Sequence, residues 1–425
     1  MKTVLKTIIV LGCGIIGGYL LLVMVFCLPL GRIHNNILES SASFDGEYKV
    51  LVNDNITTKL DDYTDALMLL TAEDNNDRNP FTGSIFAYHL SRKDTFPNKL
   101  ITDLGNPENV HSQYSRYWHG YLLFLKPLLL FFNYSQIQIL ISFVAIGLVI
   151  GVSYCLQKRK LSKYIIPYGI TVAVMFLPAI SLSIQYISVF AILNLAIICI
   201  LLFSKQLEKN LNYFYFFLVV GMLTCYFDLL TFPVVTLGLP LVVWLIVLNQ
   251  KKTLGFAENL KQIIVNGIAW GIGYFGIWVG KWLLGSVITR QNLINSAMEA
   301  ASTRASTTTA IEEISRLSAI KGAIIEAFSA PVIFICIIIL IALLILLAIK
   351  KLRFEKEKAL SNLWMLIIGL IPIAWYIVLA NHSLWHLFFT YRTITVLVFA
   401  IGCYITSTTT SVNHDDKKRR KEKNG

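Results

Sequence analysis

Residues 7–29 read TIIVLGCGIIGGYLLLVMVFCLP, an unbroken apolar run that stands almost at the start of the chain. As an α-helix this stretch would be about 34 Å long, enough to cross the roughly 30 Å hydrocarbon core of a bilayer. It has no clear small-residue cleavage site, and further apolar runs follow it. We therefore interpret it as a retained membrane anchor and not as a signal peptide.

The composition of the whole chain has the same character. Hydrophobic residues make up 56% of the 425 residues, above the share that is usual in soluble domains. Apolar runs of helical length recur to the end of the chain, which predicts an all-α polytopic membrane protein. We expect about ten transmembrane helices, at 7–29, 136–156, 164–182, 184–203, 212–228, 230–248, 262–284, 330–350, 360–380 and 386–407.

Basic residues fix the expected orientation of these spans. Lys and Arg gather before the first span, after the second, fourth, sixth and eighth, and in the tail, and together they contribute to a net charge of +12. With ten spans, every basic cluster lies in the cytoplasm, and so do both termini. Because topology accounts for these charges, we do not expect nucleic acid as a partner. The scheme requires that residues 117–134 form an interfacial helix and do not cross.

This topology divides the chain into six segments. Two of them are large and extracellular. One is the first loop, which includes the interfacial helix, and the other is a second loop in which a mobile small-residue stretch, 301–310, precedes a helix with Glu312, Glu313, Arg316 and Lys321. The segments are an anchor at 1–30, the first loop at 31–135, six spans within 136–285, the second loop at 286–329, three spans within 330–408 and a basic cytoplasmic tail at 409–425.

The first loop contains the acidic run Leu60-Asp61-Asp62-Tyr63-Thr64-Asp65, which is followed by an apolar stretch. Acidic residues are favoured in the first turn of a helix, so the run has a helix-starting interpretation. In such a helix Asp61 and Asp65 share a face, and so do Asp62 and Asp65. Neighbouring carboxylates repel each other, and a cation or a role as general base makes them tolerable. Both interpretations remain open.

Charged and titratable residues of later spans fall at the same outer level as the first loop. An ionisable group near the membrane is costly, and is a functional candidate for that reason. Snorkelling, helix capping and ordinary interface positions are the alternatives for these residues. The candidates for a site at the outer boundary are Arg116, His119, Asp228, Lys281, His382, His386 and Arg392, together with the three aspartates.

This layout resembles the GT-C superfamily of integral-membrane glycosyltransferases, which have an acidic motif in the first extracellular loop and basic and histidine residues at the outer ends of later spans. Residues 64–69 (TDALML), 116–121 (RYWHGY) and 382–386 (HSLWH), with Tyr391 and Arg392, also resemble stretches of membrane proteins of Gram-positive bacteria associated with surface polysaccharide. The composition is typical of a bacterial protein, and we expect it in the plasma membrane.

The resemblance implies transfer of a sugar from a polyprenyl-phosphate-linked donor to a surface glycan or other acceptor on the outer face. It implies a general base among Asp61, Asp62 and Asp65, and basic groups that hold the lipid phosphate, with Arg392 and Lys281 as the best matches. In the family the acidic residue often lies closer to the first span than here, so Asp45 and Glu47 also remain candidates. A divalent cation at the aspartates is compatible with this chemistry, although the chemistry does not require one.

Two other functions fit the sequence less well. A polysaccharide polymerase or ligase would use the same donor, but we expect its large outer loop later in the chain. A lipid-linked-sugar flippase or other transporter would need polar groups at the midplane of the membrane, and the predicted spans place none there.

Overall fold

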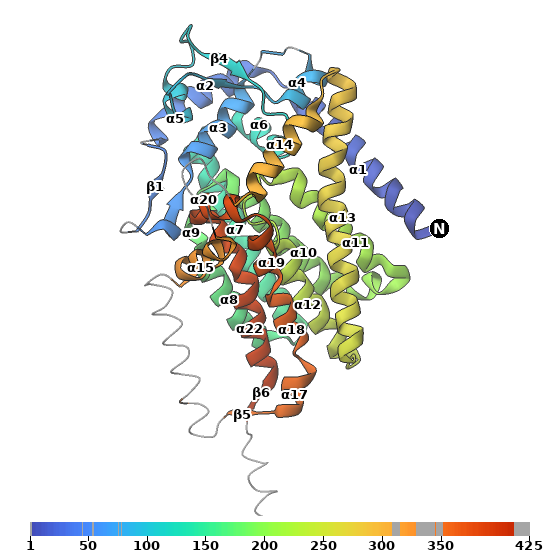
Figure 1. Ribbon diagram of the computed structural model, residues 1–425. Coiled ribbons are helices and arrows are strands. Elements are labelled where there is room, and N and C mark those ends of the chain that lie inside the picture. Colours follow the sequence, from blue (N-terminus) through green and yellow to red (C-terminus); the bar gives the residue numbers. More distant parts are fainter. Residues whose placement is uncertain are drawn as a thin grey trace, which may run out of the picture.

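The structure is a computed structural model that describes residues 2–44, 46–52, 55–74, 76–77, 79–307, 315–328, 345 and 352–411. It is mostly helical: a bundle of long helices has a layer of short helices and strands at one end (Figure 1). Within these residues, six helices are long and apolar enough to cross a membrane, which indicates a membrane-embedded protein. They are Thr3–Phe26, Tyr134–Lys158, Ile184–Leu207, Lys209–Phe227, Phe256–Thr289 and Leu387–Thr408.

The bundle is held together by close helix contacts. Helices α11 (Asn212–Phe227) and α13 (Phe256–Thr289) pack closely at two glycines, Gly221 and Gly273. A Cβ atom on Gly221 would lie 2.1 Å from the Trp270 carbonyl oxygen, and one on Gly273 would lie 2.0 Å from the Leu218 carbonyl oxygen. Small residues allow membrane helices this approach. The other bundle helices are α1 (Lys2–Phe26), α7 (Tyr134–Lys158), α8 (Ile165–Val174), α9 (Leu177–Ser181), α10 (Ile184–Leu207), α12 (Val235–Lys251), α17 (Lys356–Ser361), α18 (Trp364–Gly369), α19 (Ile371–Val378), α20 (Ala380–Trp385), α21 (Leu387–Thr390) and α22 (Thr395–Thr408).

The expected count of about ten spans is not confirmed. The predicted span 164–182 is divided into α8 and α9 at Phe176, whose φ of 57° lies in the left-handed region. The span 360–380 is divided among α17, α18 and α19, with Pro372 in the first turn of α19. Hydropathy averages over such breaks and therefore misses them. The span 230–248 corresponds to the shorter α12, and 330–350 lies outside the described residues.

The layer at the end of the bundle contains the first loop. Its helices are α2 (Leu30–Glu39), α3 (Asp62–Glu73), α4 (Pro80–Phe86), α5 (Pro97–Thr102) and α6 (Leu122–Leu129), joined by α14 (Leu293–Ala305). Helix α15 (Arg316–Ala327) packs against α19, α20 and α21 of the bundle. Strands β1 (Lys49–Val50) and β2 (Lys59–Leu60) form one antiparallel pair, and β3 (His89–Ser91) and β4 (Val110–Ser112) form another. A third pair, β5 (Leu352–Phe354) with β6 (Thr409–Ser411), lies at the opposite end of the bundle.

Helix α6 replaces the expected interfacial helix. It has eight residues, so it is about 12 Å long and too short to cross a bilayer. It packs against α1, α2 and α3, and the buried Lys126 amino group donates to the Ala72 carbonyl oxygen at 2.8 Å. The predicted helix near Arg316 corresponds to α15, whereas Glu312 and Glu313 lie outside the described residues. Residues 301–305, expected to be mobile, form the last turn of α14.

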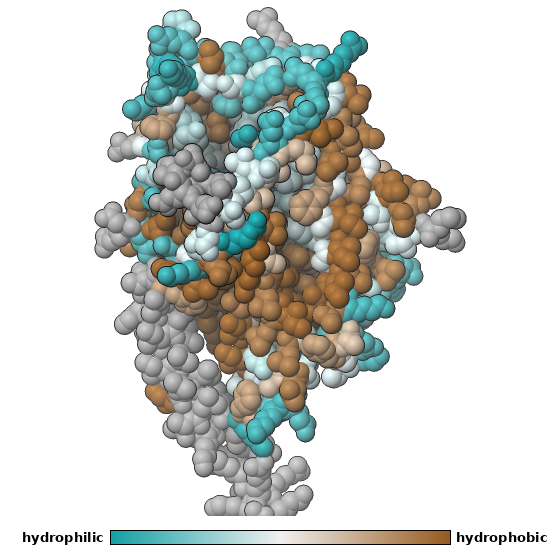
Figure 2. All heavy atoms as spheres, viewed as in Figure 1, coloured by the Kyte–Doolittle hydropathy of each residue, from teal (hydrophilic) through white to brown (hydrophobic). Residues whose placement is uncertain are grey.

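The basic ends of several helices meet at the end of the bundle opposite to this layer. Gln250 of α12 donates to the Arg159 carbonyl oxygen after α7 at 3.3 Å, and Arg159 donates to Ser204 Oγ of α10 at 2.7 Å. Lys251 forms an ion pair with Glu208. Figure 2 shows hydrophilic residues on the layer and at the opposite tip, and a hydrophobic surface between them. The basic helix ends that the sequence analysis assigns to one side of the membrane therefore also lie together in space.

Candidate functional site

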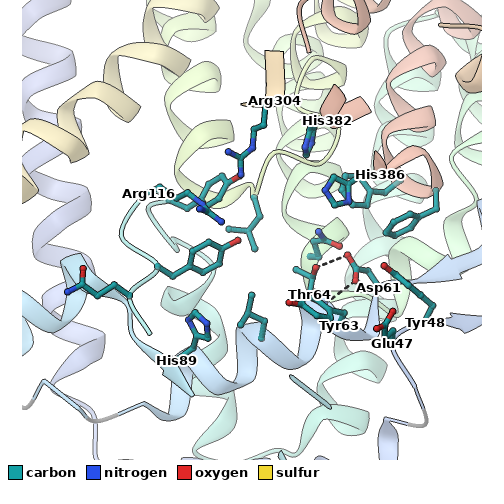
Figure 3. A pocket seen from close by; sticks show the side chains of 18 residues that line it. Glu47, Tyr48, Asp61, Tyr63, Thr64, His89, Arg116, Arg304, His382 and His386 are labelled. Atoms are coloured by element: carbon teal, nitrogen blue, oxygen red, sulfur yellow. Dashed lines mark hydrogen bonds between the residues drawn. The ribbon is translucent and has the colours of Figure 1, made fainter. Parts of the chain in front are cut away.

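A cavity of about 510 Å³ lies between the layer and the bundle. Its walls come from the segment before β1, the start of α3, the first residue of β3, the segment after β4, the first turn of α10, the turn after α11, α14 and the residues around α20 and α21. Figure 3 shows their side chains facing a common space. Of the site residues predicted from the sequence, Asp61, Arg116, His382 and His386 line it, and so does the alternative base Glu47.

Asp61 lies at the wall of the cavity because it caps α3. Its carboxylate accepts hydrogen bonds from the Thr64 backbone N–H at 3.0 Å and from the Thr64 hydroxyl at 2.7 Å (Figure 3), as expected of an N-cap aspartate. The predicted helix start is thereby confirmed. Only 4% of Asp61 is exposed, and burial raises the pKa of its carboxyl group to about 6. Such a group changes protonation state close to neutral pH.

Two arginines form the opposite wall. Arg304 of α14 donates to the Tyr117 hydroxyl at 3.0 Å and to the Ala300 carbonyl oxygen at 2.8 Å. The Arg116 guanidinium lies 4.9 Å from the centre of the Tyr114 ring, and its buried Nε has no acceptor among the described residues. Neither arginine has an ion pair with a described carboxylate, so this wall carries positive charge that an anion can neutralise.

His382 and His386 complete the cavity between these two walls (Figure 3). Burial lowers the pKa of His382 to about 3 and that of His386 to about 4, so both rings are neutral at physiological pH. His382 Nε2 lies 2.7 Å from the Leu230 carbonyl oxygen and must donate to it, which leaves Nδ1 as an acceptor. The two histidines therefore offer hydrogen bonds to a ligand but no charge.

Asp65, a predicted base, does not line the cavity. Its side chain is 1% exposed, and its carboxylate accepts hydrogen bonds from the Tyr134 hydroxyl at 2.7 Å and from the backbone N–H groups of Ile184 and Gln185, both at 3.0 Å. It therefore caps the amino end of α10. Burial raises its pKa to about 7 despite these donors.

The predicted phosphate ligands Arg392 and Lys281 also lie behind the cavity wall. Arg392 is fully buried and donates to the carbonyl oxygens of Met175 at 2.8 Å, Phe388 at 3.0 Å and Thr57 at 3.2 Å. Lys281 is fully buried as well and donates to the Tyr117 carbonyl oxygen. Their hydrogen bonds join separate segments of the chain.

Three further predicted residues lie away from the cavity lining. Asp228 accepts from the backbone N–H of Thr231 at 2.9 Å and from its hydroxyl at 2.6 Å, which closes the turn after α11. His119 is held by the Tyr121 hydroxyl at 3.0 Å and the Tyr114 carbonyl oxygen at 2.7 Å. Asp62 is buried, and burial followed by the charge of Asp65 raises its pKa to about 7.

Several lining residues were not predicted from the sequence. Arg304 lies in the small-residue stretch that we expected to be mobile, and its only signal is a lone positive charge in an outer loop. Gln185 and the tyrosines Tyr48, Tyr63, Tyr114 and Tyr117 resemble ordinary interface residues in the sequence. Glu47, which remained an alternative base, does line the cavity, whereas Asp45 lies outside the described residues.

Among the described residues, no group of three or more His, Cys, Asp or Glu side chains is arranged to hold a metal ion. Comparisons of the chain with protein-family models, with curated proteins and with solved structures found no match.

Proposed function

We propose that this protein is a glycosyltransferase that moves a sugar from a polyprenyl-phosphate donor to an acceptor hydroxyl at the outer face of the membrane. One observation carries the proposal: a single cavity has a buried carboxylate of raised pKa, Asp61, on one wall, and on the other two arginines, Arg116 and Arg304, that form no ion pair with any carboxylate the structure describes. Residues for both the base and the phosphate site therefore face one space.

The reaction needs both walls. Asp61 takes the proton of the acceptor hydroxyl while the hydroxyl oxygen forms a bond to the anomeric carbon of the donor sugar. The bond from that carbon to the phosphate oxygen breaks, and the electron pair leaves with the polyprenyl phosphate. Arg116 and Arg304 neutralise this phosphate, since guanidinium groups bind phosphate oxygens in pairs.

The position of the cavity suits a lipid-linked donor and an aqueous acceptor. The basic helix ends gather at the far end of the bundle, as shown by Arg159, Gln250 and Lys251. The positive-inside rule assigns that end to the cytoplasm, which leaves the cavity on the outer side. The bundle has an apolar surface (Figure 2), along which the prenyl chain can remain in lipid.

The test compares two neighbouring carboxylates of the acidic run. Purified protein is incubated with a panel of polyprenyl-phosphate hexoses, and release of polyprenyl phosphate is measured. We expect Asp61→Asn to lower the rate by roughly 10²–10⁴-fold, the usual contribution of a general base. Asp62→Asn, which removes a carboxylate outside the cavity, should keep most of the activity. Turnover of Asp61→Asn at the wild-type rate, or no turnover of any donor by the wild type, would refute the proposal.

A further inference from the structure

A second cavity lies at the opposite end of the bundle from the candidate site. It has a volume of about 300 Å³, and its walls come from the turn after α7, the end of α12, the residues between α17 and α18, the first turn of α18 and the end of α22. We call it the basal cavity. The positive-inside rule assigns these helix ends to the cytoplasm, and on that assignment the basal cavity lies at the level of the lipid head groups.

Two lysines of the basal cavity carry positive charge that no carboxylate balances within the described part of the chain. Lys160 and Lys163 both line the cavity, and neither takes part in an ion pair with a described residue. Burial, followed by the positive charge of Lys358, lowers the pKa of the Lys163 amino group. Lys358 itself is paired, because its Nζ lies 3.0 Å from the Glu355 carboxylate. An anion in the basal cavity would therefore find two cations available to it.

The backbone at Lys160 indicates that its side chain has a use of its own. Helix α7 ends in a Schellman motif: the Lys160 N–H donates to the Gln157 carbonyl oxygen and the Leu161 N–H to the Leu156 carbonyl oxygen, both at 2.9 Å. Lys160 has a φ of 60°, in the left-handed region where glycine is the usual residue, because a Cβ atom is disfavoured there. Topology requires only that basic residues lie in this turn, and Lys158 supplies such a charge without strain. A lysine at the strained position is therefore not explained by topology alone.

We propose that the basal cavity binds a phosphate group, with Lys160 and Lys163 as the cations that hold it. Lysine binds phosphate as a point charge on a flexible stem, so a pair of lysines can close on the group from two sides. Leu161, Ile246 and Met365 also line the cavity, which adds apolar surface beside the charge. Cationic and apolar groups together at the ends of membrane helices suit an anionic phospholipid head group, the source of phosphate that the position favours. The site is separate from the proposed function and does not depend on it.

The experiment measures the apparent melting temperature of the full-length protein in three kinds of micelle. The first contains phosphatidylcholine, whose phosphate is balanced by its own ammonium group, the second contains anionic phosphatidylglycerol, and the third contains phosphatidylcholine with inorganic phosphate at the same ionic strength. A ligand that binds only the folded state stabilises it, and we expect phosphatidylglycerol to raise the melting temperature of the wild type by about 2 °C or more. The Lys160→Gly/Lys163→Gln variant should lose most of this rise. In phosphatidylcholine it should melt like the wild type, because glycine is the usual residue at the position of Lys160.

The matched control is Lys205→Gln/Lys209→Gln, which removes two exposed lysines from the same end of the bundle but outside the basal cavity. This variant should keep the rise in melting temperature. A rise with phosphatidylglycerol that only the cavity variant loses supports the site and assigns it to a lipid head group. A rise with inorganic phosphate that only the cavity variant loses supports the site and assigns it to a soluble phosphate. No rise with either probe, an equal rise in the cavity variant, or an equal loss in the control variant would overturn the proposal.

Discussion

The cavity surface, formed by Glu47, Asp61, Arg116 and Arg304, contrasts with the layer of buried charges behind it, formed by Asp65, Asp228, Lys281 and Arg392. Behind the wall, the charged side chains are hydrogen-bonded to backbone groups or hydroxyls of the protein itself. On the cavity surface, both arginines lack an ion pair among the described residues. Both sets are charged and close to the membrane, so charge alone does not identify a site. The unpaired charges are the ones available to a ligand.

The largest effect should come from Arg392. Arg392→Met removes three hydrogen bonds from a buried guanidinium to the carbonyl oxygens of Thr57, Met175 and Phe388, and at Thr57 and Met175 leaves only the longer contacts of the Tyr391 hydroxyl, at 3.3 and 3.4 Å. We expect a loss of about 3 kcal/mol or more of folding free energy, because a hydrogen bond to a charged group contributes about 1.5 kcal/mol or more. The apparent melting temperature of the detergent-solubilised protein measures this loss.

The exposed Arg290→Met, which removes the same charge at the end of α13, provides the control and should melt like the wild type. The contrast between the cavity surface and the buried charges behind it would be wrong if Arg392→Met melts like the wild type while its KM for the donor rises. Arg392 would then be a ligand of the phosphate.

The second effect concerns pH. Asp61 acts as a base only when it is deprotonated, and burial raises its pKa to about 6. Below this pH we expect kcat/KM to fall about tenfold for each pH unit, and above it to level off. A pH profile of polyprenyl phosphate release measures this fall in kcat/KM at acidic pH. The Asp62→Asn variant should show the same fall. If the fall disappears in that variant, the titrating group is Asp62 and not Asp61.

The smallest effect should come from Arg304. Arg304→Gln removes one of two guanidinium groups from the cavity surface, and a charge-assisted hydrogen bond contributes about 1.5 kcal/mol. We expect the KM for the donor to rise roughly tenfold with little change in melting temperature. Steady-state kinetics with Arg290→Gln as the control measure this, and a fall in melting temperature without a change in KM would place Arg304 among the structural residues.

The long helices of the fold could be predicted from sequence, and their interruptions could not. The predicted spans at 136–156 and 184–203 correspond to α7 and α10, because an apolar run of that length has few other stable forms in a bilayer. The break at Phe176 depends on one backbone angle, which apolar composition does not specify. The short strands of the first loop were missed for a similar reason, since strands of two or three residues leave no periodic pattern.

For the site, the sequence predicted the height of the residues relative to the membrane, but it did not predict which way their side chains point. Topology places Asp61, His382 and Arg392 near one boundary of the membrane, but only the first two face the cavity. Which way a side chain points depends on the rotation of its helix and on its neighbours, and a span prediction contains neither. Arg304 was missed because its small neighbours indicate a loop, whereas it lies in the last turn of α14.

Helix α3 also fixes the orientation of the Asp61 and Asp65 carboxylates relative to each other. Asp61 caps it at the cavity, and Asp65, four residues later, holds the first turn of α10. A single residue inserted between them would turn one carboxylate by about 100° and shift it by about 1.5 Å relative to the other. The acidic run is thus a spacer of fixed length, in which the number of residues matters as much as their identity. Homologous chains that keep both aspartates but change their separation would have to rebuild one of the two contacts.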